Sequence, residues 1–181
     1  MYSKAKIGGH PLHPMLVAFP ITFYLATFLG FIVYQVVSPD IFWFKLAYFS
    51  NFAAVVTALV AAVPGFIDWT FGIPKGTAAK KDGLIHMSLN LVVLAIYAIN
   101  AYTVWGTWET GKVGLGTNIF LTAVGSLLLA GAGFYGWKMI GYHKVGVDLS
   151  PEQERYQELY EREVPFVPPR EHRNEQPPMF H

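Results

Sequence analysis

The sequence predicts an all-α integral membrane protein, a four-helix bundle with cytoplasmic termini and an extended C-terminal tail. Residues 7–39, 46–67, 83–108 and 113–137 contain no Asp, Glu, Lys or Arg. Each run can cross the hydrocarbon core of a bilayer, which needs about 20 apolar residues in a helix. Only 14% of the 181 residues are charged, whereas a soluble domain carries roughly a quarter. The expected parts are a strap at 1–12, a four-helix domain at 13–148 (helices 14–37, 42–64, 78–106 and 117–142) and a tail at 149–181.

The composition excludes several classes of function. The net charge is +1, which offers no basis for binding nucleic acid. The chain contains no cysteine, so it forms no disulfide, thiolate metal site or iron–sulfur centre of its own. It also lacks a phosphate-binding loop, a dinucleotide fingerprint, a nucleophile elbow and a zincin motif. We therefore expect an electron-transfer or structural role rather than an enzyme.

Prolines shape the start of the chain. His10 and His13 each precede a proline, which favours extended backbone at both positions. Pro14 is suited to the first position of a helix, where its missing N–H costs nothing. We therefore expect an extended strap followed by a helix that starts at Pro14 and bends at Pro20, inside the apolar run.

The other helices have recognisable ends. Pro64 and Gly65 are expected to stop the second helix, and Thr77 is expected to cap the third. After the fourth helix, Ser150 and Pro151 predict a short charged helix that extends to about Glu163. The remaining tail is rich in proline and cannot bury a core of its own, so we expect it either to be disordered or to lie along a partner.

Lysines predict the orientation. Seven lysines are expected at the face that carries both termini, and two at the other face. Cytoplasmic loops of membrane proteins carry an excess of Lys and Arg. The apolar stretch that begins at His13 is longer than the core of a signal peptide. We therefore expect a multi-pass protein of the bacterial inner membrane, with both termini in the cytoplasm.

Histidines gather at this same face. The alternating direction of the four helices places His10, His13, Asp68, His86 and His143 in one layer. His86 is the deepest, and Asn90 follows it by one helical turn, on the same side. An ionisable residue inside a membrane span is by default a hypothesis of function. We interpret His143 as an interfacial surface residue.

Three interpretations of this layer remain open. In the first, His13 and His86 bind a b-type haem, supported by Asp68 and Asn90, because imidazoles from different helices can ligate iron axially. In the second, His10, His13 and His86, with Asp68, hold a single divalent metal. In the third, no cofactor is bound, and the histidines pin the N-terminal strap. A quinone site is a further alternative to haem.

Short motifs then carry a resemblance to a known family. They are Gly9-His10-Pro11-Leu12-His13-Pro14, Phe19-Pro20-Ile21, Gly65 with Asp68, His86 with Asn90, and Tyr142 with Gly146-Val147-Asp148. Together they resemble the bacterial membrane family named domain of unknown function 2231, over about residues 8–148. The resemblance implies a four-helix membrane domain. Some relatives look fused to Rieske-type iron–sulfur domains, which implies an electron-transfer setting.

The resulting expectation is a membrane subunit of a larger inner-membrane electron-transfer complex. Since the chain has no cysteine, an iron–sulfur partner must be another polypeptide. Besides lipid, the expected partners are other protein subunits, which contact residues 149–181 and the helix faces. The alternatives are a purely structural subunit with a histidine-pinned strap and a non-haem metal-binding membrane protein.

Overall fold

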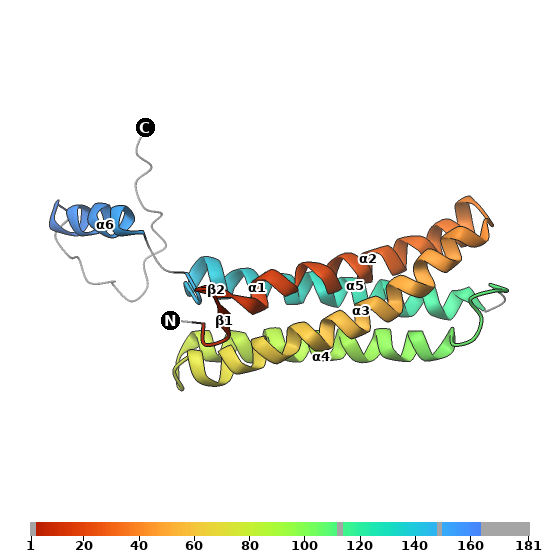
Figure 1. Cartoon of the computed structure of the whole chain (residues 1–181), viewed down its shortest axis with the longest axis horizontal. Coiled ribbons are helices and arrows are strands. Elements are labelled where there is room, and N and C mark those ends of the chain that lie inside the picture. Colours follow the sequence, from red (N-terminus) through yellow and green to blue (C-terminus); the bar gives the residue numbers. More distant parts are fainter. Residues whose placement is uncertain (1–2, 112–113, 148–149, 164–181) are drawn as a thin grey trace, which may run out of the picture. The chain divides into compact units, whose positions relative to one another are not determined.

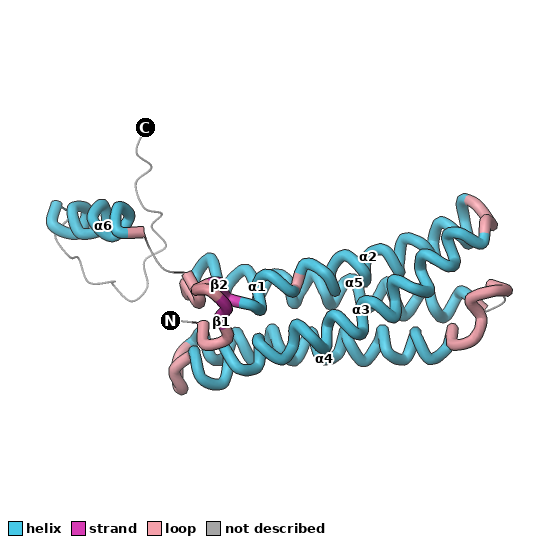
Figure 2. The backbone as a smooth tube through the Cα atoms, viewed as in Figure 1, coloured by secondary structure: helices cyan, strands magenta, loops and turns pink. Residues whose placement is uncertain are grey.

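The computed structural model describes residues 3–111, 114–147 and 150–163. In this part of the chain, four helical segments are long and apolar enough to cross a membrane: Leu12–Val37, Ile41–Gly72, Ala78–Thr103 and Leu115–Tyr142. They lie side by side and form an all-α bundle, with the connections between spans at its two ends (Figures 1 and 2). The predicted all-α four-helix bundle is confirmed.

The N-terminal segment forms a small hairpin instead of an extended strap. Strand β1 (Lys6–Ile7) pairs antiparallel with β2 (His10–Pro11). Gly8 and Gly9 form the turn with φ angles of 57° and 84°, which glycine adopts without steric cost. The Leu12 N–H donates to the Ala5 carbonyl at 2.9 Å and closes the hairpin onto the first helix.

The first span starts earlier than expected and is interrupted once. It consists of α1 (Leu12–Leu16), α2 (Ala18–Ile32) and a π-helical turn, η1 (Val33–Val37). His13 is therefore helical, although it precedes Pro14, because the hairpin sets the helical start at Leu12. The break at Val17 has a local cause: Pro20 has no N–H to donate to the carbonyl one turn earlier.

The second span runs through the proline that was expected to end it. Helix α3 (Ile41–Ile67) continues into a π-helical turn, η2 (Asp68–Gly72), and Pro64 lies buried inside α3. Membrane helices tolerate such prolines because neighbouring groups satisfy the freed backbone atoms. The Asp40 carboxylate caps the start of α3 by accepting the Phe42 N–H at 2.8 Å.

Two further helices complete the bundle. Helix α4 (Ala78–Thr103) starts after Thr77, whose hydroxyl accepts the Lys80 N–H at 3.2 Å. Helix α5 (Leu115–Trp137) continues into a π-helical turn, η3 (Lys138–Tyr142). The bundle therefore brings the start of the first span, η2, the start of α4 and η3 to one end, which we call the hairpin end (Figure 1).

The charged segment that follows the bundle forms a separate unit. Helix α6 (Pro151–Glu163) starts with a reciprocal cap: Ser150 Oγ accepts the Gln153 N–H at 3.2 Å, and Gln153 Oε1 accepts the Ser150 N–H at 2.9 Å. This pair has the geometry of a capping box. The predicted extended segment beyond Glu163 lies outside the described residues.

The core of the bundle combines aromatic and polar side chains. Tyr24 and Tyr97 are in contact near its middle, with ring centroids 4.2 Å apart. Phe31 and Phe44 are fully buried nearer to the end opposite the hairpin. Many apolar side chains on the outside remain exposed, as expected for surfaces that contact lipid hydrocarbon.

Candidate functional site

The structure brings His13 of α1 and His86 of α4 together at the hairpin end. Their ring centroids lie 6.1 Å apart, with an angle of 86° between the ring planes. Both side chains are half-buried. Two residues separated by the first two membrane spans therefore form one pair inside the bundle.

Backbone from a neighbouring helix holds the ring of His13. Its Nδ1 lies 2.9 Å from the Ala61 carbonyl oxygen of α3. One turn further along α3, Gly65 lies against the same ring, and a Cβ at that position would come within 2.7 Å of His13 Nδ1. Only glycine leaves room for the imidazole there, so Gly65 is needed for the position of the ring.

The ring of His86 is held in the same manner by α5. Its Nδ1 lies 2.8 Å from the Ala132 carbonyl oxygen, and a Cβ at Gly136 would come within 3.0 Å of its Cε1. Asn90 lies beside the ring: its Nδ2 is 3.3 Å from His86 Nε2 and 3.5 Å from Nδ1. The Asn90 amide also donates to the His86 carbonyl at 2.8 Å, which fixes its position.

These contacts determine which ring nitrogens carry protons. A carbonyl oxygen only accepts hydrogen bonds, so Nδ1 of each neutral ring must be the protonated donor. Nε2 of each ring then carries a lone pair. A neutral imidazole that donates from one nitrogen to backbone and has a lone pair on the other is the form that binds metals. In His86 the Asn90 amide lies 3.3 Å from this second nitrogen.

Asp68 has a different role from the expected one beside the histidines. Its Oδ1 accepts the backbone N–H groups of Lys4 and Ala5 at 2.6 and 2.8 Å, and its Oδ2 accepts the Ser3 hydroxyl at 2.8 Å. The carboxylate is buried. It therefore anchors the residues that lead into the N-terminal hairpin, because two backbone N–H groups satisfy Oδ1 and the Ser3 hydroxyl satisfies Oδ2.

The metal set of three histidines is not assembled. His10 is exposed on β2, and within the described residues no three His, Asp or Glu side chains are close enough to hold a metal ion. An extended backbone would have turned His10 and His13 the same way, although at a wide separation. The backbone instead changes from strand to helix at Leu12, which places His10 on β2 and His13 on α1.

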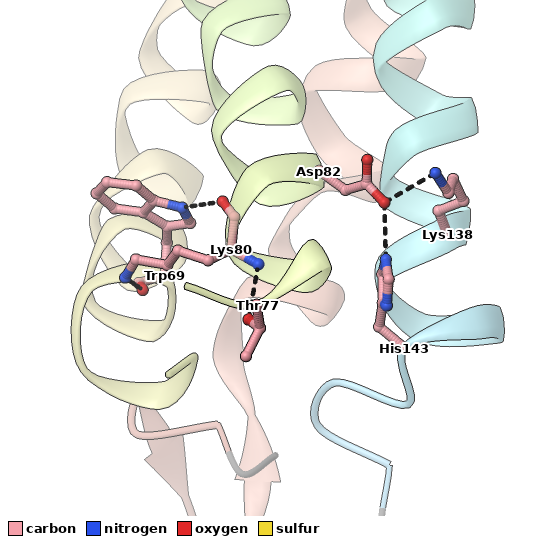
Figure 3. Close-up of polar contacts among 6 residues, drawn as sticks. All are labelled: Trp69, Thr77, Lys80, Asp82, Lys138 and His143. Atoms are coloured by element: carbon pink, nitrogen blue, oxygen red, sulfur yellow. Dashed lines mark hydrogen bonds and ion pairs between the residues drawn. The ribbon is translucent and has the colours of Figure 1, made fainter. Parts of the chain in front are cut away.

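The sequence analysis missed a charged cluster at the same end of the bundle. Asp82 Oδ2 accepts from His143 Nε2 at 2.7 Å and from Lys138 Nζ at 2.8 Å (Figure 3). The side chain of His143 is only 9% exposed, so its interpretation as a surface residue is wrong. The signal was present: Asp82 immediately precedes a charge-free run, and the topology places the start of α4 beside η3.

A second missed feature is a ladder of buried asparagines. Asn118 Nδ2 donates to Asn100 Oδ1 at 2.9 Å and to Thr103 Oγ1 at 2.7 Å. When the Asn51 amide is oriented so that both its oxygen and its nitrogen have partners, the oxygen accepts from Asn100 Nδ2 at 3.0 Å. All three asparagines are fully or almost fully buried. They join α3, α4 and α5. The sequence signal that could have predicted this contact is the presence of polar residues at matching depths of three charge-free runs.

Comparison with known proteins assigns the family. No curated protein and no solved structure matches the chain. A family model described as a predicted membrane protein of the family DUF2231 matches residues 9–149. This range contains His10, His13, Asp68, His86 and Asn90, and it confirms the resemblance carried by the sequence motifs. The chain therefore belongs to the DUF2231 family of predicted membrane proteins.

Proposed function

We propose that this chain is an electron-transfer subunit of a larger bacterial inner-membrane complex, in which His13 and His86 ligate the iron of a b-type haem. One observation carries the proposal: two imidazoles from different helices lie edge to face with centroids 6.1 Å apart, and each has its Nδ1 engaged by a backbone carbonyl. The Nε2 atoms, which carry the remaining lone pairs, are the proposed ligands.

The separation of the rings supports a single metal between them. Metal-to-imidazole nitrogen bonds are about 2.0–2.1 Å long, so two rings that would hold one ion can have centroids no more than roughly 6 Å apart. The observed separation of His13 and His86 is 6.1 Å. Glycines at 65 and 136 keep both rings in place.

The number of ligands favours haem over a bare ion. Structural zinc almost always has four ligands, and the described residues supply no group of three ligating side chains. Haem iron needs only axial ligands from the protein, because the macrocycle supplies the others. The proposed role of Asn90 is to hold the His86 ring in its orientation through the contacts described above.

The visible spectrum tests this proposal. The full-length protein, purified in detergent and within its native complex, is expected to show a sharp alpha band in a dithionite-reduced minus oxidised spectrum. His13→Ala and His86→Ala should abolish this band, whereas His10→Ala, at an exposed position outside the pair, should retain it. His86→Met should preserve a band but raise the potential, because methionine is a competent axial ligand.

Two results would contradict haem ligation. One is a flat spectrum from fully folded wild-type protein, and the other is an unchanged spectrum in both His13→Ala and His86→Ala. Metal analysis of the same samples then separates a non-haem ion from a protein without a metal. The proposal is supported if the wild-type protein contains iron in the stoichiometry of haem and if either histidine variant loses this iron.

A structural role is the second candidate, and Asp68 favours it. The carboxylate anchors three consecutive residues of the N-terminal segment, and His13 ties α1 to α3. In this alternative, the histidines hold the bundle end together for assembly with a partner. His86→Ala would then lower thermal stability without any spectral change.

The proposed partner contact involves residues 149–181. Deleting them is expected to release the other subunits and leave the spectrum unchanged. Continued co-purification of the truncated chain would oppose this role.

The proposed cytoplasmic termini are testable because the chain has no native cysteine. Lys4→Cys should resist a membrane-impermeant maleimide in spheroplasts, and Glu109→Cys, at the opposite end of the bundle, should react.

A further inference from the structure

A cavity of about 410 Å³ opens at the hairpin end, on the side where η2 meets the start of α4. Its walls include Trp69, Ala78, Lys80, Lys81 and Leu84. The cavity is shallow and wide open, unlike the concave sites that enclose most of a small molecule. The cavity involves neither histidine of the proposed haem site, so it requires an explanation of its own.

One wall of the cavity is held rigidly. Trp69 Nε1 donates to the Lys80 carbonyl at 3.1 Å, and Lys80 Nζ lies 4.0 Å from the centroid of the Trp69 ring (Figure 3). Lys80 Nζ also donates to the carbonyls of Trp69 and Thr70. The charge of Lys80 is therefore engaged by the protein itself, and its side chain serves to fix the indole.

Lys81 differs from its neighbour. Its side chain is exposed and makes no ion pair or side-chain hydrogen bond within the described part of the chain. Leu84, three residues later on the same face of α4, is 46% exposed and apolar. The cavity thus has an available cation near the start of the span and an apolar surface further along it.

A cation followed by an apolar surface matches the headgroup and acyl chain of a phospholipid at the edge of a bilayer. Trp69 lies where a span ends, the level at which indoles sit among headgroups. Other lysines belong to segments at the same end, including Lys4, Lys75, Lys138 and Lys144. Clustered basic residues next to membrane spans attract anionic lipids by about 1 kcal/mol per residue.

We propose that this cavity binds the headgroup of an anionic phospholipid, with its phosphate beside Lys81 and an acyl chain along Leu84. The ligand class is a phosphodiester lipid such as phosphatidylglycerol. Charge complementarity favours it over a zwitterionic lipid, and the apolar surface at Leu84 favours a lipid over a free phosphate ion.

Native mass spectrometry of the full-length protein in detergent tests this site. Phosphatidylglycerol should bind at least fivefold more tightly than phosphatidylcholine with the same acyl chains, and inorganic phosphate should not compete. Lys81→Gln should weaken phosphatidylglycerol binding about fivefold, because it removes the charged donor in the cavity wall beside the proposed phosphate. Lys4→Gln, an identical charge change at an exposed residue outside the cavity, should leave the affinity within twofold.

A second variant separates cavity occupancy from charge. Ala78 is exposed in the wall of the cavity, so Ala78→Trp should fill it and reduce binding without altering any charge. Equal losses in Lys81→Gln and Lys4→Gln would overturn the site in favour of general attraction to the basic end. Unchanged lipid binding in Ala78→Trp would also overturn the proposed site. Competition by inorganic phosphate would show that the ligand of the cavity is a small anion and not a lipid. Because His86→Ala should leave lipid binding unchanged, this test is independent of the haem proposal.

Discussion

Asp82 and His143 are 61 positions apart in the chain, yet His143 Nε2 lies 2.7 Å from Asp82 Oδ2. Lys138 shares the same oxygen at 2.8 Å. The carboxylate on α4 therefore receives two donors from the fourth span, one from η3 and one from the residue after it. This contact ties the start of the third span to the end of the fourth, next to the half-buried His86.

Replacing this carboxylate should loosen the end of the fourth span. In Asp82→Asn, His143 and Lys138 lose their common charged acceptor, since a neutral amide forms weaker hydrogen bonds. We expect a lower Tm and faster amide exchange over residues 138–143. Lys144→Gln, which changes a nearby charge outside this cluster, serves as control. Equal exchange rates in wild type and Asp82→Asn would show that the contact contributes nothing to local stability.

Removing the anchor of the hairpin should release the N-terminal segment. Asp68→Ala eliminates three hydrogen bonds to one carboxylate, and bonds to charged groups contribute about 1.5–3 kcal/mol each. The two bonds made by the Lys4 and Ala5 amides alone contribute roughly 3 kcal/mol or more, so the exchange of these amides should become at least about 100-fold faster. Hydrogen exchange measures this directly. Asp40→Ala, which removes a helix cap at the opposite end, should leave both amides unchanged.

The asparagine ladder should show measurable coupling. In a double-mutant cycle, Asn100→Ala and Asn118→Ala are expected to couple by about 0.6–1.7 kcal/mol, the range measured for hydrogen bonds between membrane helices. Reversible unfolding in bicelles supplies the four free energies. Thr22→Val provides a comparison, because its exposed hydroxyl bonds only within its own helix, to Ala18. Strict additivity of the two asparagine variants would refute an energetic role for their hydrogen bond.

Two glycines on α5 make a matched pair. Gly136→Ala would place a Cβ 3.0 Å from His86 Cε1, whereas Gly133→Ala meets no atom within 4 Å. We expect Gly136→Ala to displace the imidazole and reduce occupancy of the proposed haem several-fold. Gly133→Ala should keep the occupancy and stabilise the helix by up to about 1 kcal/mol. Cofactor content from visible spectra, together with proton–nitrogen NMR of the histidine rings, checks both variants.

The NMR measurement also tests the tautomers. The carbonyls of Ala61 and Ala132 require both rings to carry the proton on Nδ1. A folded wild-type protein without cofactor whose His13 and His86 signals indicate Nε2–H rings would contradict the proposed ligation. Equal loss of the Nδ1–H signal of His86 in Gly133→Ala and Gly136→Ala would contradict the steric argument for Gly136.

The sequence by itself determined the membrane class, the number of spans and the shared layer of His13 and His86. These properties follow from the length of charge-free runs and from the alternating direction of consecutive spans, which are local or topological. The tertiary structure alone decided that Asp68 holds the hairpin, that Asp82 pairs with His143 and that His10 stays outside the pair. In a lipid-facing bundle the helices are apolar on most sides, so their hydrophobic pattern does not determine their rotation or vertical offset. Those two variables decide which polar side chains meet.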